Sequence, residues 1–182
     1  MDGRILILSG PSGVGKDTVI DTWRARNPRV KRVVAYTTRA PRTGETNGID
    51  YHFVDRPTFD RMAAAGDFLE FKEVHGNGYA TPLRDLDAML HQGLIAILKI
   101  DVQGALHAMN VRPDALSVFL LPPSYEELER RIHGRASDSA AAIALRLQNA
   151  QEELAAAPQY RHRIVNDDLA ATVQTLEDLV SE

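Results

Sequence analysis

The chain has 182 residues, 44% of them hydrophobic and 25% charged, which is enough to bury a full core in one compact unit and excludes a disordered chain. Its formal net charge of -4 argues against nucleic acid or an anionic membrane as the main partner, because both usually require a basic surface. The absence of cysteine excludes disulfides, thiol catalysis and thiolate metal sites.

Five short apolar runs alternate with helical patterns and predict an α/β fold with a mostly parallel sheet and helices on both faces. The runs cover residues 5–8, 30–36, 94–100, 116–121 and 163–165. Ligands of such sheets collect at the carboxyl ends of the strands. The first run is too short for a signal peptide or a membrane span, so we expect a soluble, cytoplasmic protein.

Helical periodicity and capping residues predict helices between these runs. They cover residues 17–26, 82–91, 124–133, 137 or 138 to 156, and 168–179. The third opens with a capping box of Ser124 and Glu127 and closes at Gly134. Residues 36–81 break the alternation, and strand-like pieces at 51–54 and 68–74 predict a small β-rich insert there.

The stretch GPSGVGKDT, residues 10–18, follows the first apolar run and precedes the first predicted helix. In a Gly-x-x-x-x-Gly-Lys loop the glycines let backbone N–H groups surround phosphate oxygens, and the helix adds its positive end. Lys16 would reach the β and γ phosphates of a nucleotide. The position between a strand and a helix therefore favours a nucleotide-binding loop over a structural turn.

Asp17 follows this lysine, where a hydroxyl normally ligates Mg²⁺. A carboxylate could also hold the metal, directly or through water, because Mg²⁺ prefers hard oxygen ligands. Alternatively, Asp17 caps the helix and Thr18 serves the phosphates. The sequence leaves both readings open.

Residues 24–42 hold seven Lys or Arg residues and no acid, in a chain that is acidic overall. A solvated basic face and an RNA contact are the alternatives to an anion site. Arg39 and Arg42 flank a proline, and Tyr51 and Tyr79 offer phenol hydroxyls further along. Arginine forks and phenols together can fix one phosphate by geometry as well as charge.

Ordered segments along the whole chain resemble the guanylate kinase family. They are GPSGVGKDT, YTTRAPRTGETNGIDYHF, FLEFKEVHGNGYATP, IDVQGA, LLPPSYEELERRIHGRASDS, and RLQNAQEEL followed by IVNDDL. The resemblance implies a P-loop nucleoside monophosphate kinase fold in a single domain, with a central parallel sheet flanked by helices. It implies a core of residues 1–34, 83–124 and 148–182, a β-rich GMP-binding insert at 35–82, and a helical lid at 125–147.

The resemblance also implies site residues on the acceptor side. Arg39, Arg42, Tyr51 and Tyr79 would hold the GMP phosphate. Glu70 would accept hydrogen bonds from guanine N1–H and the amino group, with Thr81 assisting at the base; the alternative for Glu70 is a surface carboxylate. Asp101 would line the GMP site and act on Mg²⁺ through water, and its alternative is a helix cap before the helix that starts at Gln103.

The ATP side comprises the loop and residues from the lid and the last strand. The implied ATP contacts are Gly10, Pro11, Ser12, Gly13, Val14, Gly15, Lys16, Asp17, Thr18, Arg131, Arg135, Asn166 and Asp167. The implied catalytic residues are Lys16, Arg39, Asp101, Arg135 and Arg146, and the metal would meet Asp17 or Thr18, and Asp101 through water. Arginines 130, 131 and 135 could instead pair with glutamates 126, 127 and 129 on a solvated helix.

Three further residues depart from the family pattern. Ala35 replaces a serine near the guanine, Ala80 replaces a glycine, and Lys99 occupies a usually acidic position. The cation at position 99 would repel Mg²⁺, or pair with Asp17 or Asp101. These departures bear on metal placement and turnover.

The function that the resemblance implies is phosphoryl transfer from MgATP to GMP, giving ADP and GDP. The cofactor would be Mg²⁺ and the partners ATP and GMP, without nucleic acid or membrane, in a monomer or weak homodimer. One alternative is a kinase for another phosphorylated acceptor such as ribose 1,5-bisphosphate. The other is a non-catalytic guanylate kinase-like module that binds phosphopeptides.

Overall fold

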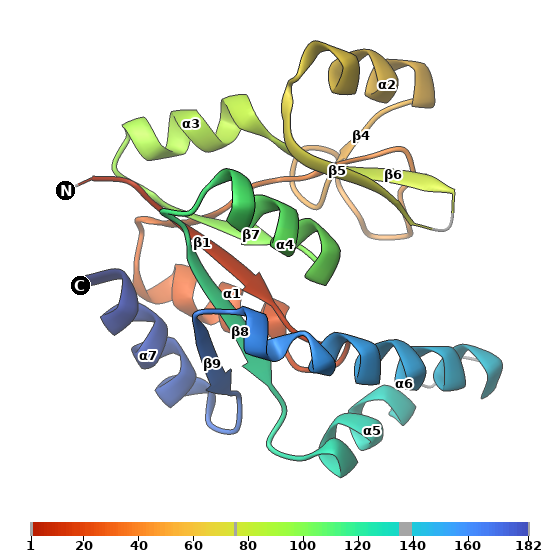
Figure 1. The fold of residues 1–182 in the computed structure, drawn as a ribbon, viewed down its shortest axis with the longest axis vertical. Helices are drawn as coiled ribbons and strands as arrows, with labels where there is room; N and C mark the ends of the chain where they lie inside the picture. The colour runs from red at the N-terminus through yellow and green to blue at the C-terminus, as the bar shows by residue number, and fades with distance from the viewer. Residues whose placement is uncertain (1, 75, 135–139, 182) are drawn as a thin grey trace.

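The computed structural model describes residues 2–74, 76–134 and 140–181. Five strands form one fully parallel sheet in the order β2-β7-β1-β8-β9 (Figure 1). These strands are β1 (Arg4–Ser9), β2 (Val30–Arg32), β7 (Ile95–Lys99), β8 (Leu116–Leu121) and β9 (His162–Val165). The predicted α/β class with a central parallel sheet is confirmed.

Alternate residues of each strand point to opposite faces of this sheet, and both faces are covered by helices (Figure 1). Leu6 and Leu8 join a core with α1 (Lys16–Arg26) and α7 (Leu169–Ser181). Ile5 and Ile7 join a second core with α3 (Leu83–His91) and α4 (Val102–Val111). Burial on both faces explains why the strands read as continuous apolar runs.

A second sheet stands above the carboxyl end of β7 and has the order β4-β3-β6-β5. Its strands are β3 (Tyr36–Thr37), β4 (His52–Phe53), β5 (Phe68–Val74) and β6 (Asn77–Pro82). The apolar run at residues 30–36 is therefore not one strand, because its first part belongs to the parallel sheet and its end to the second sheet.

The insert also contains a helix that the sequence analysis missed, α2 (Arg56–Ala65). Asp55 caps its start by accepting from the Thr58 N–H at 2.9 Å, and Gly66 ends it in a left-handed conformation. Phe59 packs from this helix onto Phe68, so a small separate core fixes the insert. Three local features mark this helix in the sequence, namely Asp55 at the N-cap, Pro57 at its start and Gly66 after its last turn.

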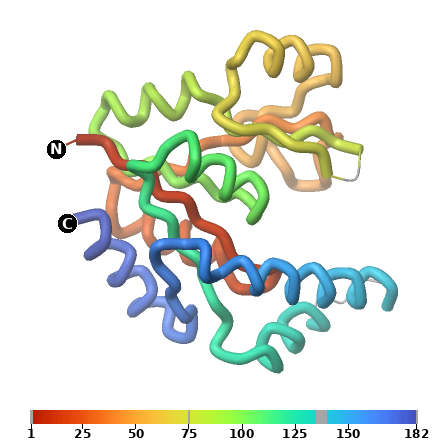
Figure 2. The backbone as a smooth tube through the Cα atoms, viewed as in Figure 1, coloured from red at the N-terminus to blue at the C-terminus, as the bar shows by residue number. Residues whose placement is uncertain are grey.

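Two helices follow β8, α5 (Tyr125–His133) and α6 (Ala140–Ala155). A short 3-10 helix, Ala157–Gln159, then leads to β9. Leu128 and Ile132 of α5 pack against Ala150 of α6. Both described chain ends lie on the opposite side of the molecule from these two helices (Figure 2). Within the described part of the chain, no helix combines the length and apolarity needed to cross a bilayer.

Glu177 joins the first and last helices of the fold. Its carboxylate accepts hydrogen bonds from the fully buried Trp23 indole N–H and from the Asn27 amide, the latter at 2.7 Å. Glu177→Ala should therefore lower the free energy of unfolding by about 1–3 kcal/mol, since it leaves a buried donor unpaired. Urea denaturation measures this loss. Asp178→Ala, on the exposed side of the same helix, should cost less than about 0.5 kcal/mol; equal losses would refute the assignment.

Candidate active site

The loop between β1 and α1 has the backbone geometry of a phosphate cradle. Gly10, Gly13 and Gly15 have φ angles of 148°, 87° and 99°. At Gly10 a side chain is also excluded sterically, because an added Cβ would lie 2.6 Å from the Leu120 carbonyl oxygen. Left-handed residues in such a turn direct successive N–H groups to one side, at the positive end of α1.

Lys16 folds back over this loop. Its ammonium donates to the Gly10 carbonyl and to the Pro11 carbonyl, the latter at 3.1 Å. Burial, together with the nearby charge of Lys99, lowers the pKa of Lys16 to about 8, although Glu153 and Asp17 oppose the shift. The ammonium therefore lies over the loop, where oxygens of a bound phosphate would replace the carbonyls of Gly10 and Pro11 as its acceptors.

Two contacts that sequence reasoning missed brace the loop from distant parts of the chain. Asn166, which is 7% exposed, donates its amide to the Val14 carbonyl at 2.8 Å. Glu153 of α6 accepts from the Ser12 N–H at 3.3 Å. Asp167, the residue that follows Asn166 after β9, is exposed. No local pattern reports the contacts of residues 153 and 166, because each joins residues more than 140 positions apart.

Asp17 lies in the first turn of α1 but is not its N-cap, which is Gly15. Its carboxylate accepts from the Lys99 ammonium at 2.6 Å and lies 3.9 Å from the Arg32 guanidinium. Burial opposes ionisation of Asp17, but the hydrogen bond and charge of Lys99, with the charge of Arg32, hold its pKa below the ordinary value. Of the two partners expected for Lys99, the structure shows Asp17.

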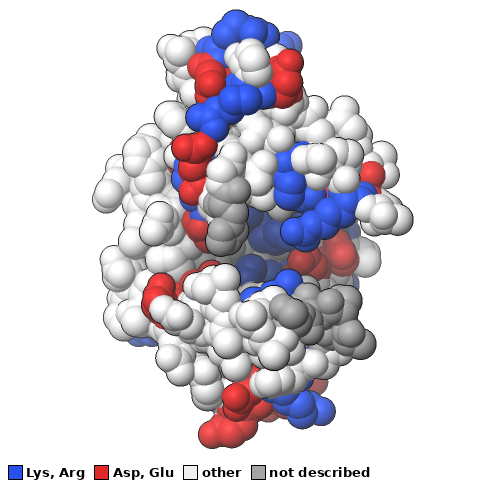
Figure 3. Space-filling model, turned by 90° about the vertical axis from the view of Figure 1, so that its right-hand side faces the viewer, with Lys and Arg blue, Asp and Glu red and all other residues white. Residues whose placement is uncertain are grey.

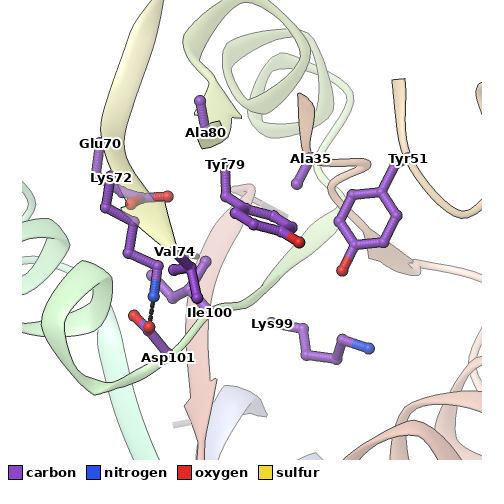
Figure 4. Close-up of a pocket in the computed structure, with 10 residues that line it drawn as sticks. All are labelled: Ala35, Tyr51, Glu70, Lys72, Val74, Tyr79, Ala80, Lys99, Ile100 and Asp101. Atoms are coloured by element: carbon purple, nitrogen blue, oxygen red, sulfur yellow. Dashed lines mark ion pairs between the residues drawn. The ribbon is translucent and has the colours of Figure 1, made fainter. Parts of the chain in front are cut away.

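A pocket of about 230 Å³ separates the second sheet from the carboxyl end of β7 (Figure 4). Its lining residues are Ala35, Tyr51, Glu70, Lys72, Val74, Tyr79, Ala80, Lys99, Ile100 and Asp101. The pocket brings together four of the residues predicted for the acceptor side, namely Tyr51, Glu70, Tyr79 and Asp101. Figure 3 shows Lys and Arg side chains around a hollow in this face of the molecule, with acidic side chains beside them.

Glu70 is a buried carboxylate, 5% exposed, so the alternative reading as a surface residue is wrong. The Thr81 hydroxyl donates to it at 2.7 Å, which places Thr81 behind the pocket wall. Gly104 of α4 leaves room for the carboxylate, because an added Cβ would lie 2.8 Å from Glu70 Oε2. Burial raises the pKa of Glu70 despite the Thr81 hydrogen bond and the charges of Lys72 and His107.

Asp101 is the N-cap of α4, as the helix-cap alternative expected, and accepts from the Gly104 N–H at 3.0 Å. Its other oxygen pairs with the Lys72 ammonium (Figure 4). Lys72 was missed by sequence reasoning, although it stands two positions after Glu70 on β5 and so on the same face of the strand. Burial lowers the pKa of Lys72, while Glu70 and Glu153 oppose this.

The Arg39 guanidinium lies 5.5 Å from the ring centre of Tyr51, a residue that lines the pocket. Two of its nitrogens bind the Glu45 carboxylate at 2.9 and 3.0 Å, and Glu45 also accepts from the Arg42 backbone N–H at 2.7 Å. These hydrogen bonds, that of Arg39 foremost, lower the pKa of Glu45 to about 2. The Arg42 residue is exposed.

Other members of the basic segment serve the fold. Arg29 donates to the Gly93 carbonyl at 2.7 Å, and Arg32 donates to the Ile49 carbonyl at 2.8 Å. The charge asymmetry of residues 24–42 thus reflects backbone contacts as well as the pair Arg39 and Arg42. A count of charges in the sequence does not distinguish arginines that bind backbone carbonyls from the pair Arg39 and Arg42.

In α5, the Ser124 hydroxyl caps the helix by accepting from the Glu127 N–H at 3.1 Å. The Glu127 carboxylate does not reach back to Ser124 as a capping box requires; it accepts from Arg130 and Arg131, at 2.7 Å from each. Arg131 also approaches the Val14 carbonyl of the loop at 3.5 Å. Arg146 lies on α6, and Arg135 falls outside the described residues.

Comparison with known proteins gives a consistent result. The sequence model of the guanylate kinase family matches residues 2–182. Guanylate kinase of Nostoc sp. is 46% identical over 177 residues, covering 97% of this chain and 89% of that protein. Guanylate kinase of Frankia casuarinae is 46% identical over 176 residues, covering 97% and 96%. The crystal structure of guanylate kinase from Anaplasma phagocytophilum superposes with a TM-score of 0.77 at 35% identity, covering 99% and 85% of the two chains.

The raised pKa of Glu70 has a measurable consequence for stability. Because the folded state favours the protonated carboxyl, the wild-type protein should lose stability relative to Glu70→Gln as the pH rises from 4 through the folded pKa. Urea unfolding of both proteins between pH 4 and 8 measures this slope.

Asp55→Asn is the control of opposite sign. The Thr58 hydrogen bonds lower the pKa of Asp55, so the wild-type protein should gain stability relative to this variant as the pH rises through the folded pKa, below about pH 4, and the difference should be constant above about pH 5. A pH-independent difference for Glu70→Gln would contradict the burial of an ionisable group at position 70.

Proposed function

The chain belongs to the guanylate kinase family, which transfers a phosphoryl group from ATP to GMP, and we propose that the pocket and the phosphate loop form one active site for this reaction. The products are ADP and GDP. The observation that carries the assignment of the pocket is the buried Glu70 carboxylate, which faces a cavity that borders the carboxyl ends of the strands.

Glu70 suits guanine for a chemical reason. The pairing edge of guanine presents two adjacent donors, N1–H and the amino group, which one carboxylate accepts together, whereas adenine presents no such pair. A site built around these hydrogen bonds rejects the wrong base strongly, because its buried polar groups are then left unpaired. Thr81 orients the carboxylate through its 2.7 Å hydrogen bond.

The phosphate of GMP would lie at the opposite end of the pocket, between Tyr51, Tyr79 and Arg39, with Arg42 in reach. Arg39 must then exchange part of its contact with Glu45 for phosphate oxygens. Such exchange is feasible because the guanidinium carries five donors in a planar fork.

No general base is needed in this reaction. The second pKa of a phosphate monoester lies near 6, so the attacking oxygen of GMP is already ionised at neutral pH. Catalysis therefore reduces to alignment and neutralisation of two polyanions. We assign these tasks to Lys16 in the loop, to Arg39 on the acceptor side, and to Arg135 and Arg146 from the helical lid. Asp101 is anionic and would contribute through water at the magnesium site. Closure of residues 125–147 would exclude water from the transfer.

The ATP-binding residues follow the loop. Residues 10–18 would surround the phosphates, Arg131 would approach them from α5, and Asn166 with Asp167 would lie beside the adenine. Asn166 already links this region to the loop through its hydrogen bond to the Val14 carbonyl.

The donor set at the loop fits Mg²⁺, the cofactor implied by a kinase that uses ATP. Asp17, Thr18 and Asp101 offer carboxylate and hydroxyl oxygens, which this hard cation prefers. Among the described residues no cluster of three or more acidic, histidine or cysteine side chains forms a metal cage, and Mg²⁺ in kinases takes much of its shell from substrate phosphates and water. We propose that Thr18 or Asp17 meets the ion, and that Asp101 acts through water. When bound, Mg²⁺ supplies charge neutralisation at the phosphates.

We further propose a cytoplasmic enzyme that acts as a monomer or weak homodimer, with ATP and GMP as its partners and without nucleic acid. Sedimentation velocity at micromolar concentration tests the oligomeric state, and a tight higher oligomer would contradict it.

The reaction itself is tested by ADP release with MgATP and a panel of acceptors. Turnover should be confined to GMP and dGMP, with none for AMP, UMP or ribose 1,5-bisphosphate. Glu70→Ala should lower kcat/KM for GMP by about 100-fold or more, since guanine loses its paired acceptor. Glu73→Ala, an exposed change on the same strand, is the matched control and should retain activity.

Two outcomes of this assay would contradict the proposal. Turnover only with the sugar bisphosphate would identify a kinase for a different acceptor. Binding of GMP without turnover would identify a binding module.

Lys16 offers a second test, through its pKa of about 8 in the free protein. Phosphates that approach the ammonium favour its charged form, so ATP binding at pH 8 without divalent cations should take up about half a proton. Uptake should rise toward one proton at pH 9. Titration calorimetry in two buffers of different ionisation enthalpy measures it, and no uptake at either pH would show that Lys16 does not meet the phosphates.

A further inference from the structure

Lys99 lines the pocket at the end of β7, the strand beside β1, which leads into the phosphate loop. It ends β7 and is paired in register with Leu8 of β1, one residue before Ser9 and the loop. Two residues later, Asp101 begins α4. The side chain at position 99 therefore stands between the donor side and the acceptor side of the site.

The ammonium of Lys99 is held but still accessible. It donates to Asp17 at 2.6 Å, and the side chain is 24% exposed, against 68% for Asp17. Lys99 also lines the pocket. A ligand in the pocket can thus meet this side chain, and the largely exposed carboxylate of Asp17 has solvent to turn into.

The close-up of the pocket shows two chemically different ends (Figure 4). Glu70, Lys72 and Asp101 lie on one side, where the purine edge is expected. The phenol oxygens of Tyr51 and Tyr79 point toward the other side, and the ammonium of Lys99 extends to that side as well. Two phenols and an ammonium form a set of donors suited to one phosphate.

We propose that Lys99 binds the phosphate of GMP at the end of the pocket marked by the phenols of Tyr51 and Tyr79, and that Asp17 is its counterion before GMP binds. This inference rests on the proposed function, because it takes GMP as the acceptor. An unpaired ammonium at this half-buried position would be costly and would repel Lys16, so a carboxylate partner stabilises it until the substrate arrives. The phosphate, with its greater charge, then replaces Asp17 as the main acceptor.

Among the described residues, Lys72 and Lys99 are the cations that line this pocket, and each is paired with a carboxylate. Lys16 is bound to loop carbonyls, Arg39 is bound to Glu45, and Lys72 is paired with Asp101 on the side of the base. Lys99 is the cation that lines the pocket on the side of both phenols. The exchange of charge between positions 17 and 99 therefore gives this chain an additional phosphate contact.

A simpler role for Lys99 is to neutralise Asp17 and nothing more. The two roles differ in what happens when Asp17 is already absent. If Lys99 serves only Asp17, its removal from an Asp17→Ser background should leave GMP binding unchanged. If it contacts the phosphate, the loss should persist in that background.

The experiment is a double-mutant cycle on GMP binding, measured by titration calorimetry without ATP or divalent cations. The variants are Lys99→Met, Asp17→Ser and both together, with Lys31→Met, an exposed change on the neighbouring strand β2, as the charge-matched control. We expect removal of Lys99 to weaken GMP binding at least about 10-fold in both backgrounds, as befits a charge-assisted hydrogen bond. Lys31→Met should change it less than about twofold.

Lys99→Arg guards against an effect of misfolding, since it keeps the cation and should retain most of the affinity. If the double variant binds GMP as tightly as Asp17→Ser alone, the inference is wrong and Lys99 only balances Asp17. If the wild-type protein does not bind GMP at all, the proposed function itself fails, which distinguishes the two failures.

Discussion

The parallel direction of all five core strands is the constraint on which the site depends. Because the strands run the same way, their carboxyl ends meet at one edge of the sheet. At this edge the glycine loop follows β1, Lys99 and Asp101 lie at the end of β7, and Asn166 follows β9. The sheet of the insert lies over the same edge, so that Glu70 faces the end of β7 across the pocket.

The cations around the site each have a partner within the protein. Lys16 donates to loop carbonyls, Arg39 to Glu45, Lys99 to Asp17, and Lys72 to Asp101. Without these partners the cations would repel one another at short range, as the influence of Lys99 on the pKa of Lys16 shows. We propose that Lys16, Arg39 and Lys99 exchange these internal partners for phosphate oxygens when the two substrates bind.

Local patterns in the sequence sufficed for the parallel sheet and the phosphate loop, since apolar runs, helix caps and the glycine spacing are short-range features. Local signals also mark α2, in Asp55, Pro57 and Gly66, whereas the division of residues 30–36 between two sheets depends on the pairing of Tyr36 with Ala80. The burial of Glu70 depends on Gly104, and the partner of Asp17 lies 82 positions away. The departure from the family pattern at Lys99 predicted a pair with Asp17 or Asp101, but which of the two it takes, and the contact of Glu70 with Gly104, follow from tertiary structure.

The most direct test of a single site for two nucleotides is a bisubstrate compound, adenosine and guanosine joined through five phosphates. If the loop and the pocket are adjacent as described, it should bind at least about 100-fold more tightly than GMP alone, because the second nucleotide binds at high effective concentration. It should also displace both ATP and GMP in competition calorimetry. Binding no tighter than that of either nucleotide, with displacement of only one of them, would contradict the account.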